Sequence, residues 1–400
     1  MLHRDGGSVT FEEMKMHNIL YYNWGEVTYE DASEVLKKLG HHVITLSCKF
    51  EKYDNDQKFI DEVIKNIRNN NIDCIFSFNY FPDISRAANE CQVKYISWVY
   101  DSPHRVLDSI TLSNKCNSVY LFDYALYQLY AGMGINTVNY LPLASNVNRV
   151  QQDLEKYFAK NGHEYKHDIT FLGNMKNDEH NFFEQINYLP PYIKGYIDAA
   201  MEAQIQIFGM DLVSVLMRDD ICQEIFKLVN INMGSNYREC RKEVLISMIQ
   251  KQITAMERKR ILTVLGENYK VDHYADKKME NLPVNYMGYA SYVGQMSEIF
   301  ATSKINLNIS LRSIQTGIPL RVIDILGAGG FCITNFQAEL MNYFENGKSI
   351  VWYESYEDLF DKIAYYLEHD EERQAIAKAG HEIVKNQFNY EVAFNKILDF

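Results

Sequence analysis

The sequence lacks the patterns that mark secreted, membrane-spanning or disulfide-stapled proteins. Its seven cysteines are odd in number and scattered, and no two form a Cys-x-x-Cys pair, which favours reduced, buried thiols. Residues 1–15 lack the apolar core of a signal peptide, and no stretch approaches about eighteen uninterrupted apolar residues. We therefore expect a cytoplasmic chain without an integral membrane segment.

Positive charge is scarce as well. The 40 lysines and arginines are outnumbered by 53 aspartates and glutamates, and no basic run or basic amphipathic helix stands out. A formal net charge of -13 disfavours nucleic acid and anionic membranes as partners. An anionic ligand would therefore need a local site of positive potential.

Proline and glycine are few, with 7 and 20 in 400 residues, and the hydrophobic share is 47%. Such a composition is typical of a soluble globular protein without a disordered tail. Because a chain of this length exceeds what one hydrophobic core usually organises, we expect two domains.

Short apolar runs alternate with amphipathic helical patterns in both halves of the chain. The first half runs from "NILYYNW" through "HVITL", "IDCIFSF", "KYISWVY" and "SVYLFD" to "NTVNYLP". The second half begins at "DITFLG" and resumes with "RILTVLG", "VNYMGY", "KINLNIS", "GFCIT" and "SIVWY". Near-continuous apolar strands separated by helices predict parallel sheets covered on both faces, the doubly wound α/β architecture.

Interruptions of this alternation divide the chain. We assign 1–148 to a first Rossmann-like domain, 149–167 to a linker and 168–388 to a second Rossmann-like domain. About 179–258 shows no strand pattern, which predicts a helical insert, and we expect a helix at 389–400 to pack back on the first domain. The carboxyl ends of both sheets then face one central cleft, where such folds bind ligands.

Two motifs have the form of metal sites, and we assign a metal to neither. "HEYKH" at 163–167 matches a zinc-protease pattern, but Gly162 and the strand after it leave no room for the long helix that this pattern requires. "DND" at 54–56 directly precedes a helix, where aspartate is a preferred cap. No G-x-G-x-x-G follows the first strand, which disfavours a dinucleotide cofactor. We expect neither a metal nor a cofactor.

Polar residues follow two strands of the first domain. Asp101 and His104 come after "KYISWVY", and Asn79 and Tyr80 come after "IDCIFSF", so all four are predicted at the mouth of the cleft. A carboxylate there could accept the proton of an attacking hydroxyl, with His104 binding or tuning it. An ordinary turn at Asp-Ser-Pro explains the first pair equally well.

The second domain carries two candidate anion sites. "FLGNMKND" ends its first strand with Gly173, Asn174 and Lys176, a pattern that suits a phosphate or a simple turn with a solvated lysine. Further on, "SLRSIQTGIPLRVIDILGAGG" at 310–330 is a loop followed by a helix that Pro319 opens. Free N–H groups and the positive dipole end make such a helix start an anion site, unless the segment is only a capped core helix with surface charges.

These segments resemble a known family. The stretch from "KINLNIS" to "HEIV" is similar to the carboxyl-terminal half of the CgeB-like, spore-maturation glycosyltransferases of the GT-B fold, with their Pro-Leu-Arg-x-x-Asp/Glu before a Gly-rich turn and a strand. "FSFNYFPDISRAANECQVKYISWVYDSPH" resembles their companion domain. The resemblance covers most of the chain apart from the helical insert.

The resemblance implies a bacterial enzyme that moves a sugar from a nucleoside diphosphate donor, a UDP-sugar being favoured, without a tightly bound metal. The sugar would be a hexose or an N-acetylhexosamine, and the acceptor a glycan or a protein, with protein glycosylation of a surface protein such as flagellin as one candidate. The alternatives are a nucleotide-sugar epimerase of the same fold and a non-catalytic nucleotide-sugar-binding partner subunit.

Roles follow residue by residue. Related enzymes carry two glutamates eight positions apart, and here Asp324 takes the ribose-binding place while Thr316 replaces the other glutamate, which favours the non-catalytic alternative. Asp101 and His104 are the catalytic candidates, and Asn79 and Tyr80 lie on the acceptor side. We assign the donor diphosphate to Asn174, Lys176, Arg312, Thr316, Gly317 and Arg321, the ribose to Asp324, and the base to Gly288, Tyr289 and Tyr292.

Overall fold

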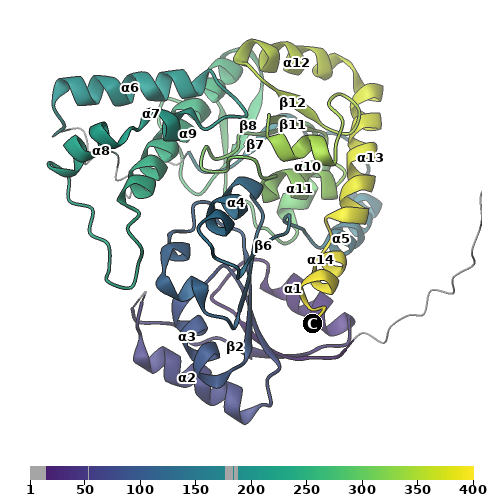
Figure 1. Ribbon diagram of the computed structural model, residues 1–400. Coiled ribbons are helices and arrows are strands. Elements are labelled where there is room, and N and C mark those ends of the chain that lie inside the picture. Colours follow the sequence, from purple (N-terminus) through teal and green to yellow (C-terminus); the bar gives the residue numbers. More distant parts are fainter. Residues whose placement is uncertain (1–14, 53, 176–182, 184–187) are drawn as a thin grey trace, which may run out of the picture.

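The computed structural model describes residues 15–400 except 53, 176–182 and 184–187 (Figure 1). Its two α/β domains each contain a six-stranded sheet. In the first sheet the strand order is β2-β1-β3-β4-β5-β6, and all neighbouring strands are parallel. The elements of this domain are β1 (Asn18–Tyr22), α1 (Tyr29–Lys38), β2 (His42–Leu46), α2 (Gln57–Asn69), β3 (Cys74–Phe78), α3 (Pro82–Cys91), β4 (Lys94–Val99), η1 (Arg105–Asp108), η2 (Ile110–Ser113), β5 (Asn117–Leu121), α4 (Tyr124–Gly132) and β6 (Val138–Tyr140).

The second sheet has the order β12-β11-β10-β7-β8-β9 and is also parallel throughout. A block of helices, α6 to α9, lies between β7 and β8 in the chain. The elements are α5 (Val147–Asn161), β7 (His167–Leu172), α6 (Pro191–Ile205), α7 (Leu212–Leu216), α8 (Asp219–Phe226), α9 (Arg241–Asn268), β8 (Val271–Tyr274), β9 (Asn285–Gly288), α10 (Gln295–Ala301), β10 (Ser303–Asn308), α11 (Leu320–Gly327), β11 (Cys332–Asn335), η4 (Ala338–Asn342), β12 (Val351–Tyr353), α12 (Tyr356–Glu368), α13 (Asp370–Gln387) and α14 (Tyr390–Ile397).

Each sheet is buried on both faces, which is why its strands read as continuous apolar runs. In β1, Leu20 and Tyr22 enter the apolar cluster on one face, while Ile19 and Tyr21 enter the cluster on the other. The predicted cap at 54–56 is confirmed, since the Asp56 carboxylate accepts a hydrogen bond from the N–H of Phe59 at the start of α2 (3.3 Å).

One predicted strand is wrong. "RILTVLG" at 260–266 belongs to α9, and the strand is the later β8. Ile261, Leu262 and Leu265 are fully buried against the second sheet at helical spacing. A short apolar run fits a buried helix turn as well as a strand, and here the continuity of a 28-residue helix decided. The helical insert therefore extends past the predicted boundary at residue 258.

Two segments tie the domains together. Residues 149–167, predicted as a linker, contain most of α5, and Leu154 packs in the same cluster as Val322 and Leu326 of α11. Helix α14 packs on the first domain, where Phe394 contacts Phe76 of β3 with ring centroids 5.5 Å apart. Figure 1 shows α13 and α14 descending along one side from the second domain to the first.

Candidate functional site

The strand order of the second sheet has its topological switch point between β7 and β10. Strands β8 and β9 extend the sheet on one side, while β10, β11 and β12 extend it on the other. Ligands of open parallel sheets bind beyond the carboxyl ends of the strands at such a point. A cavity of about 390 Å³ lies there, and we call it the second-domain cavity. Its lining includes Gly173, Asn174, Arg258, Tyr289, Ser310 and Arg321.

Two arginines give this cavity its positive charge. Arg258 of α9 is 7% exposed and donates to the carbonyl oxygens of Asn174 and Ile309 (2.7 Å to the latter), which joins the ends of β7 and β10. Arg321 of α11 contacts the sulfur of Met296. Within the described part of the chain, neither guanidinium forms an ion pair with a carboxylate.

The charges of these arginines are electrostatically coupled. Burial, and then the positive charge of Arg321, lower the pKa of Arg258 to about 10, and burial lowers the pKa of Arg321. Buried or half-buried cations that form no ion pair are costly, so an anionic ligand in this cavity would stabilise both arginines. Pro319 also lines the cavity, and no side chain caps the start of α11 there, so its free N–H groups add to the positive potential.

The structure keeps some predicted phosphate residues at this cavity and places others elsewhere. Gly173, Asn174 and Arg321 line it, and Lys176 lies outside the described residues. Arg312 does not line it. Its guanidinium pairs with the buried Glu257 of α9, with Nε 2.6 Å from Oε2, and lies over the ring of Phe208. Arg312 therefore fastens its loop to the insert, since its donors are already taken.

Thr316 and Gly317 lie at the boundary between the domains, not at the second-domain cavity. The Thr316 hydroxyl is 2.8 Å from the carboxylates of Asp123, the cap of α4, and of Glu339. A Cβ on Gly317 would come within 2.9 Å of the Cα of Asp123. The backbone of the loop therefore docks directly on the first domain, and this close approach requires a glycine.

Of the residues assigned to the ribose and the base, some line the second-domain cavity and others do not. Tyr289, 63% exposed, lines the cavity after Gly288, the last residue of β9, and offers a ring at its mouth. Asp324 does not line the cavity and accepts a hydrogen bond from the hydroxyl of Tyr292 (3.2 Å). Burial raises the pKa of Asp324 to about 6, against the nearby charge of Arg321.

A second cavity of about 760 Å³ faces the carboxyl end of β4, and we call it the interdomain cavity. It shares Leu311 and Ile314 with the second-domain cavity, so the two are neighbours across one loop. Asp101 lines it and is exposed. The Asp101 carboxylate therefore lies in the interdomain cavity, next to the cavity that holds Arg258 and Arg321.

Of the other predicted residues of the first domain, only Asn79 forms hydrogen bonds with Asp101. Asn79, with a left-handed φ of 61°, donates to Asp101 Oδ2 (2.8 Å) and accepts from the N–H groups of Tyr100 and Asp101. His104 contacts the backbone of Tyr80 through Nε2, and burial lowers its pKa, which favours the neutral ring. Tyr80 itself is fully buried and does not face the cleft. Asn79 therefore orients Asp101.

The sequence analysis did not identify Arg258, whose guanidinium is held at the site by two backbone carbonyl oxygens. It lies inside "ERKRIL", where four charged residues in a row suggest only a solvated helix face. The available signal was helical spacing, because Thr254, Ile261, Leu262 and Leu265 are buried and Arg258 falls on their face.

No metal site or membrane span is evident in the region that the structure describes. There, no three His, Cys, Asp or Glu side chains gather as metal ligands do. Among the described helices, none has both the length and the apolar character that crossing a membrane requires.

Comparisons with known proteins found one matching family model and a solved structure of similar fold. Residues 241–399, less than half of the chain, match the family model described as glycosyl transferase-like. A search among curated proteins found none that matches. A glycosyltransferase from Rickettsia africae superposes with a TM-score of 0.52 at 14% identity, over 96% of this chain and 99% of that one.

Two further solved structures are less similar. HepE from Anabaena in complex with UDP superposes with a TM-score of 0.47 at 11% identity, covering 95% of this chain and 97% of the other. Sucrose-phosphate synthase from Thermosynechococcus elongatus gives 0.49 at 10% identity, with 96% of each chain covered. We base the fold on the Rickettsia structure and on the two parallel sheets. The chain thus has the predicted two-domain GT-B fold, and its residues 241–399 match a glycosyltransferase family model.

Proposed function

We propose that this protein is a glycosyltransferase that moves a hexose or N-acetylhexosamine from a nucleoside diphosphate donor, a UDP-sugar first among them, to a protein or glycan acceptor. The observation that carries the proposal is the pair Arg258 and Arg321 at the strand ends of a GT-B second domain, two cations that form no ion pair among the described residues. Arginine donors and a free helix start bind a diphosphate and stabilise it as it leaves.

The proposed roles follow the geometry. Arg258, Arg321 and the start of α11 hold the diphosphate, Tyr289 stacks on the base, and Asp101 accepts the proton of the acceptor hydroxyl. Asp324 binds the ribose once the Tyr292 hydroxyl moves aside. In this scheme positive side chains and the helix dipole take the place of a metal ion.

The interdomain cavity supports transfer over the two alternatives. An epimerase needs no acceptor, whereas a cavity of about 760 Å³ adjoins the proposed donor site and presents Asp101. A non-catalytic subunit would not need a carboxylate held in place by Asn79 (2.8 Å). All seven cysteines are free, which supports the cytoplasm as the location. The narrower CgeB-like resemblance stays a prediction.

Calorimetric titration with UDP, GDP and dTDP tests the donor half of the proposal. We expect one of them to bind and Arg258→Met and Arg321→Met each to weaken binding at least about tenfold, since each removes a charge-assisted hydrogen bond. Arg260→Met is the matched control, because Arg260 is exposed and pairs with Glu202 (2.5 Å) away from the cavity. Equal affinity of the native protein and both variants would contradict the proposed site.

A further inference from the structure

The interdomain cavity has one wall that belongs to neither Rossmann-like domain. The loop 229–232 and helix α9 of the insert line it opposite the first-domain stretch 100–103. From α9 come Val244, Ser247, Met248, Lys251 and Thr254. The insert therefore encloses the space in front of Asp101.

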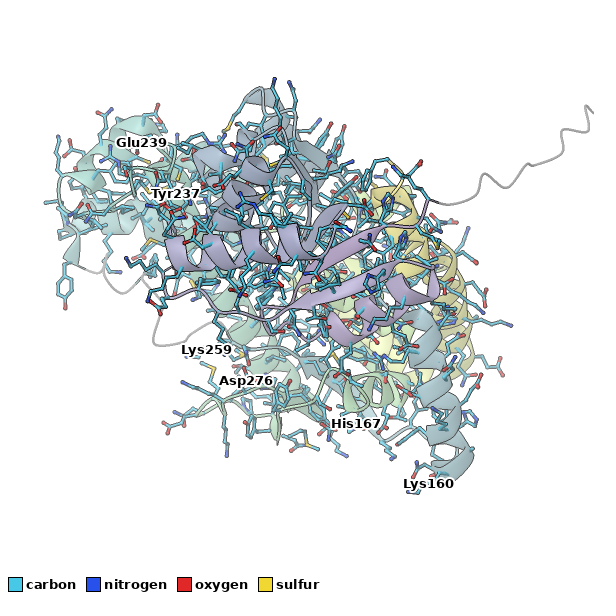
Figure 2. All side chains as sticks on the ribbon, turned by 90° about the horizontal axis from the view of Figure 1, so that it is seen from below. Lys160, His167, Tyr237, Glu239, Lys259 and Asp276 are labelled. Atoms are coloured by element: carbon cyan, nitrogen blue, oxygen red, sulfur yellow. The ribbon has the colours of Figure 1, made fainter. Side chains whose placement is uncertain are left out.

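This wall is fastened to the first domain. Beyond the cavity, the same loop of the insert reaches η1 and η2, where Ile110 donates its N–H to the carbonyl of Asn236 (2.9 Å). The backbone N–H of Arg238 donates to the carbonyl of Asp108 (2.9 Å). The Arg238 guanidinium lies 5.4 Å from the ring centre of Tyr130. Figure 1 shows this loop descending from the insert, and Figure 2 labels Tyr237 and Glu239 where it meets the helices of the first domain. The insert thus bridges the two domains and holds the cavity wall in place.

The lining of the cavity is mixed, because aliphatic side chains share it with polar and charged ones that include Arg105 and Lys251. Val229, Ile231, Val244 and Met248 of the insert face Leu311 and Ile314 of the second domain. Amide and hydroxyl groups, among them Asn230, Asn232 and Ser247, are interspersed. Tyr100 is its single aromatic residue.

This composition suits an acceptor that carries both apolar and polar groups. Sugar hydroxyls that lie against the aliphatic part of the lining would lose their hydrogen bonds to water without replacement, which is costly. A peptide offers apolar side chains for the aliphatic wall, while its backbone amides pair with asparagine and serine side chains. The cavity volume, about 760 Å³, falls in the range of ligand-binding pockets.

We propose that the insert builds the acceptor site for an extended peptide, in which a serine or threonine with aliphatic neighbours presents its hydroxyl to Asp101. The proposal rests on the proposed glycosyltransferase function. The hydroxyl oxygen bonds to the anomeric carbon of the donor sugar, and the bond from that carbon to the diphosphate oxygen breaks. Its electron pair leaves with the nucleoside diphosphate, and the hydroxyl proton passes to Asp101.

The test measures nucleotide release from whichever donor binds, with three probes. These are acetyl-Gly-Val-Ile-Ser-Val-Gly-amide, the polar match acetyl-Gly-Asn-Gln-Ser-Asn-Gly-amide, and the trimer of N-acetylglucosamine. We expect the aliphatic peptide to raise release at least about tenfold over donor hydrolysis and well above the other two. Greater stimulation by the trisaccharide, or equal rates with both peptides, would overturn the peptide assignment. Failure of the donor half appears separately, as absence of nucleotide binding.

Filling the cavity provides the second arm. Ser247→Trp on α9 and Asn232→Trp on the exposed loop should each reduce peptide-stimulated release at least about tenfold, with nucleotide affinity within about twofold of native. Val264→Trp, on the same helix but 39% exposed and outside the cavity, is the matched control. Native stimulation in both cavity variants would show that the peptide binds elsewhere. Intact nucleotide binding shows that a variant has folded.

Discussion

The hydroxyl of Thr316, in the second domain, lies 2.8 Å from the carboxylate of Asp123, in the first. The same hydroxyl lies 2.8 Å from Oε1 of Glu339, which also accepts from the N–H of Tyr124 (2.7 Å). A hydroxyl has one proton to donate, and Asp123 already accepts the N–H of Gln315 (2.7 Å). The single hydroxyl proton is therefore shared between the two carboxyl groups. Thr316 thus serves domain docking.

Removal of this hydroxyl should weaken the contact between the domains. Thr316→Val leaves Glu339 and Asp123 buried without their shared partner, which is expected to lower the free energy of unfolding by about 1–3 kcal/mol. Urea denaturation followed by tryptophan fluorescence measures the change. Thr263→Val is the control, since its hydroxyl only bonds back to the Lys259 carbonyl within α9 (2.7 Å). An equal effect of both variants would remove the docking role.

The docking contact should also depend on pH. Burial raises the pKa of Glu339 above its ordinary value of 4.5. The facing groups are Asp123 and Tyr140, and burial keeps the Tyr140 hydroxyl protonated by raising its pKa. A raised folded-state pKa stabilises the native state fully below about pH 4.5, and this contribution is lost as pH rises through the folded-state value.

Glu339→Gln isolates this effect, because the glutamine side chain has nearly the same size and shape as that of glutamate and does not titrate. We expect the difference in unfolding free energy between the native protein and this variant to shift in favour of the variant as pH rises from 4.5 to 8. Parallel stability curves over this range would show that the pKa of Glu339 does not differ between the folded and unfolded states.

Asp101 should govern transfer without affecting donor binding. Asp101→Asn removes the proposed base and is expected to lower transfer about 10²- to 10⁴-fold, while nucleotide affinity by calorimetry stays unchanged. Asn79→Asp is more diagnostic, because the new carboxylate keeps the acceptor of the Tyr100 N–H and puts a negative charge beside Asp101. A like charge raises the pKa of a carboxyl, so the acid limb of the pH–rate profile should move to higher pH. An unmoved limb would exclude Asp101 as the titrating base.

Nucleotide affinity should rise with pH if Asp324 accepts hydrogen bonds from ribose. Burial raises the pKa of this carboxyl to about 6, so ionisation between about pH 5 and 7 creates the stronger acceptor. Because the terminal phosphate of UDP titrates in a similar range, the informative quantity is the affinity ratio between the native protein and Asp324→Asn. We expect this ratio to increase across the range. A constant ratio would separate Asp324 from the ribose.

Much of the fold could be predicted because local patterns carried it. Apolar runs such as "NILYY" are buried on both faces of a parallel sheet, and Pro319 directly precedes α11 as expected. Helix α11 ends at Gly327. A side chain does not fit at Gly330, because its Cβ would lie 2.7 Å from the carbonyl oxygen of Phe300. One exception was 260–266, where helix and strand patterns coincide over a short apolar run.

The sequence by itself determined the two parallel sheets, the helical insert within the second domain and the carboxylate after β4, because strand periodicity and the order of elements are local properties. Only the tertiary structure decided which charged side chains share a space. Arg312 and Arg321 are nine residues apart in one motif, yet the first pairs with Glu257 and the second faces the cavity beside Arg258. Packing between distant elements selects the partner that each buried charge must have, and a linear pattern does not contain that choice.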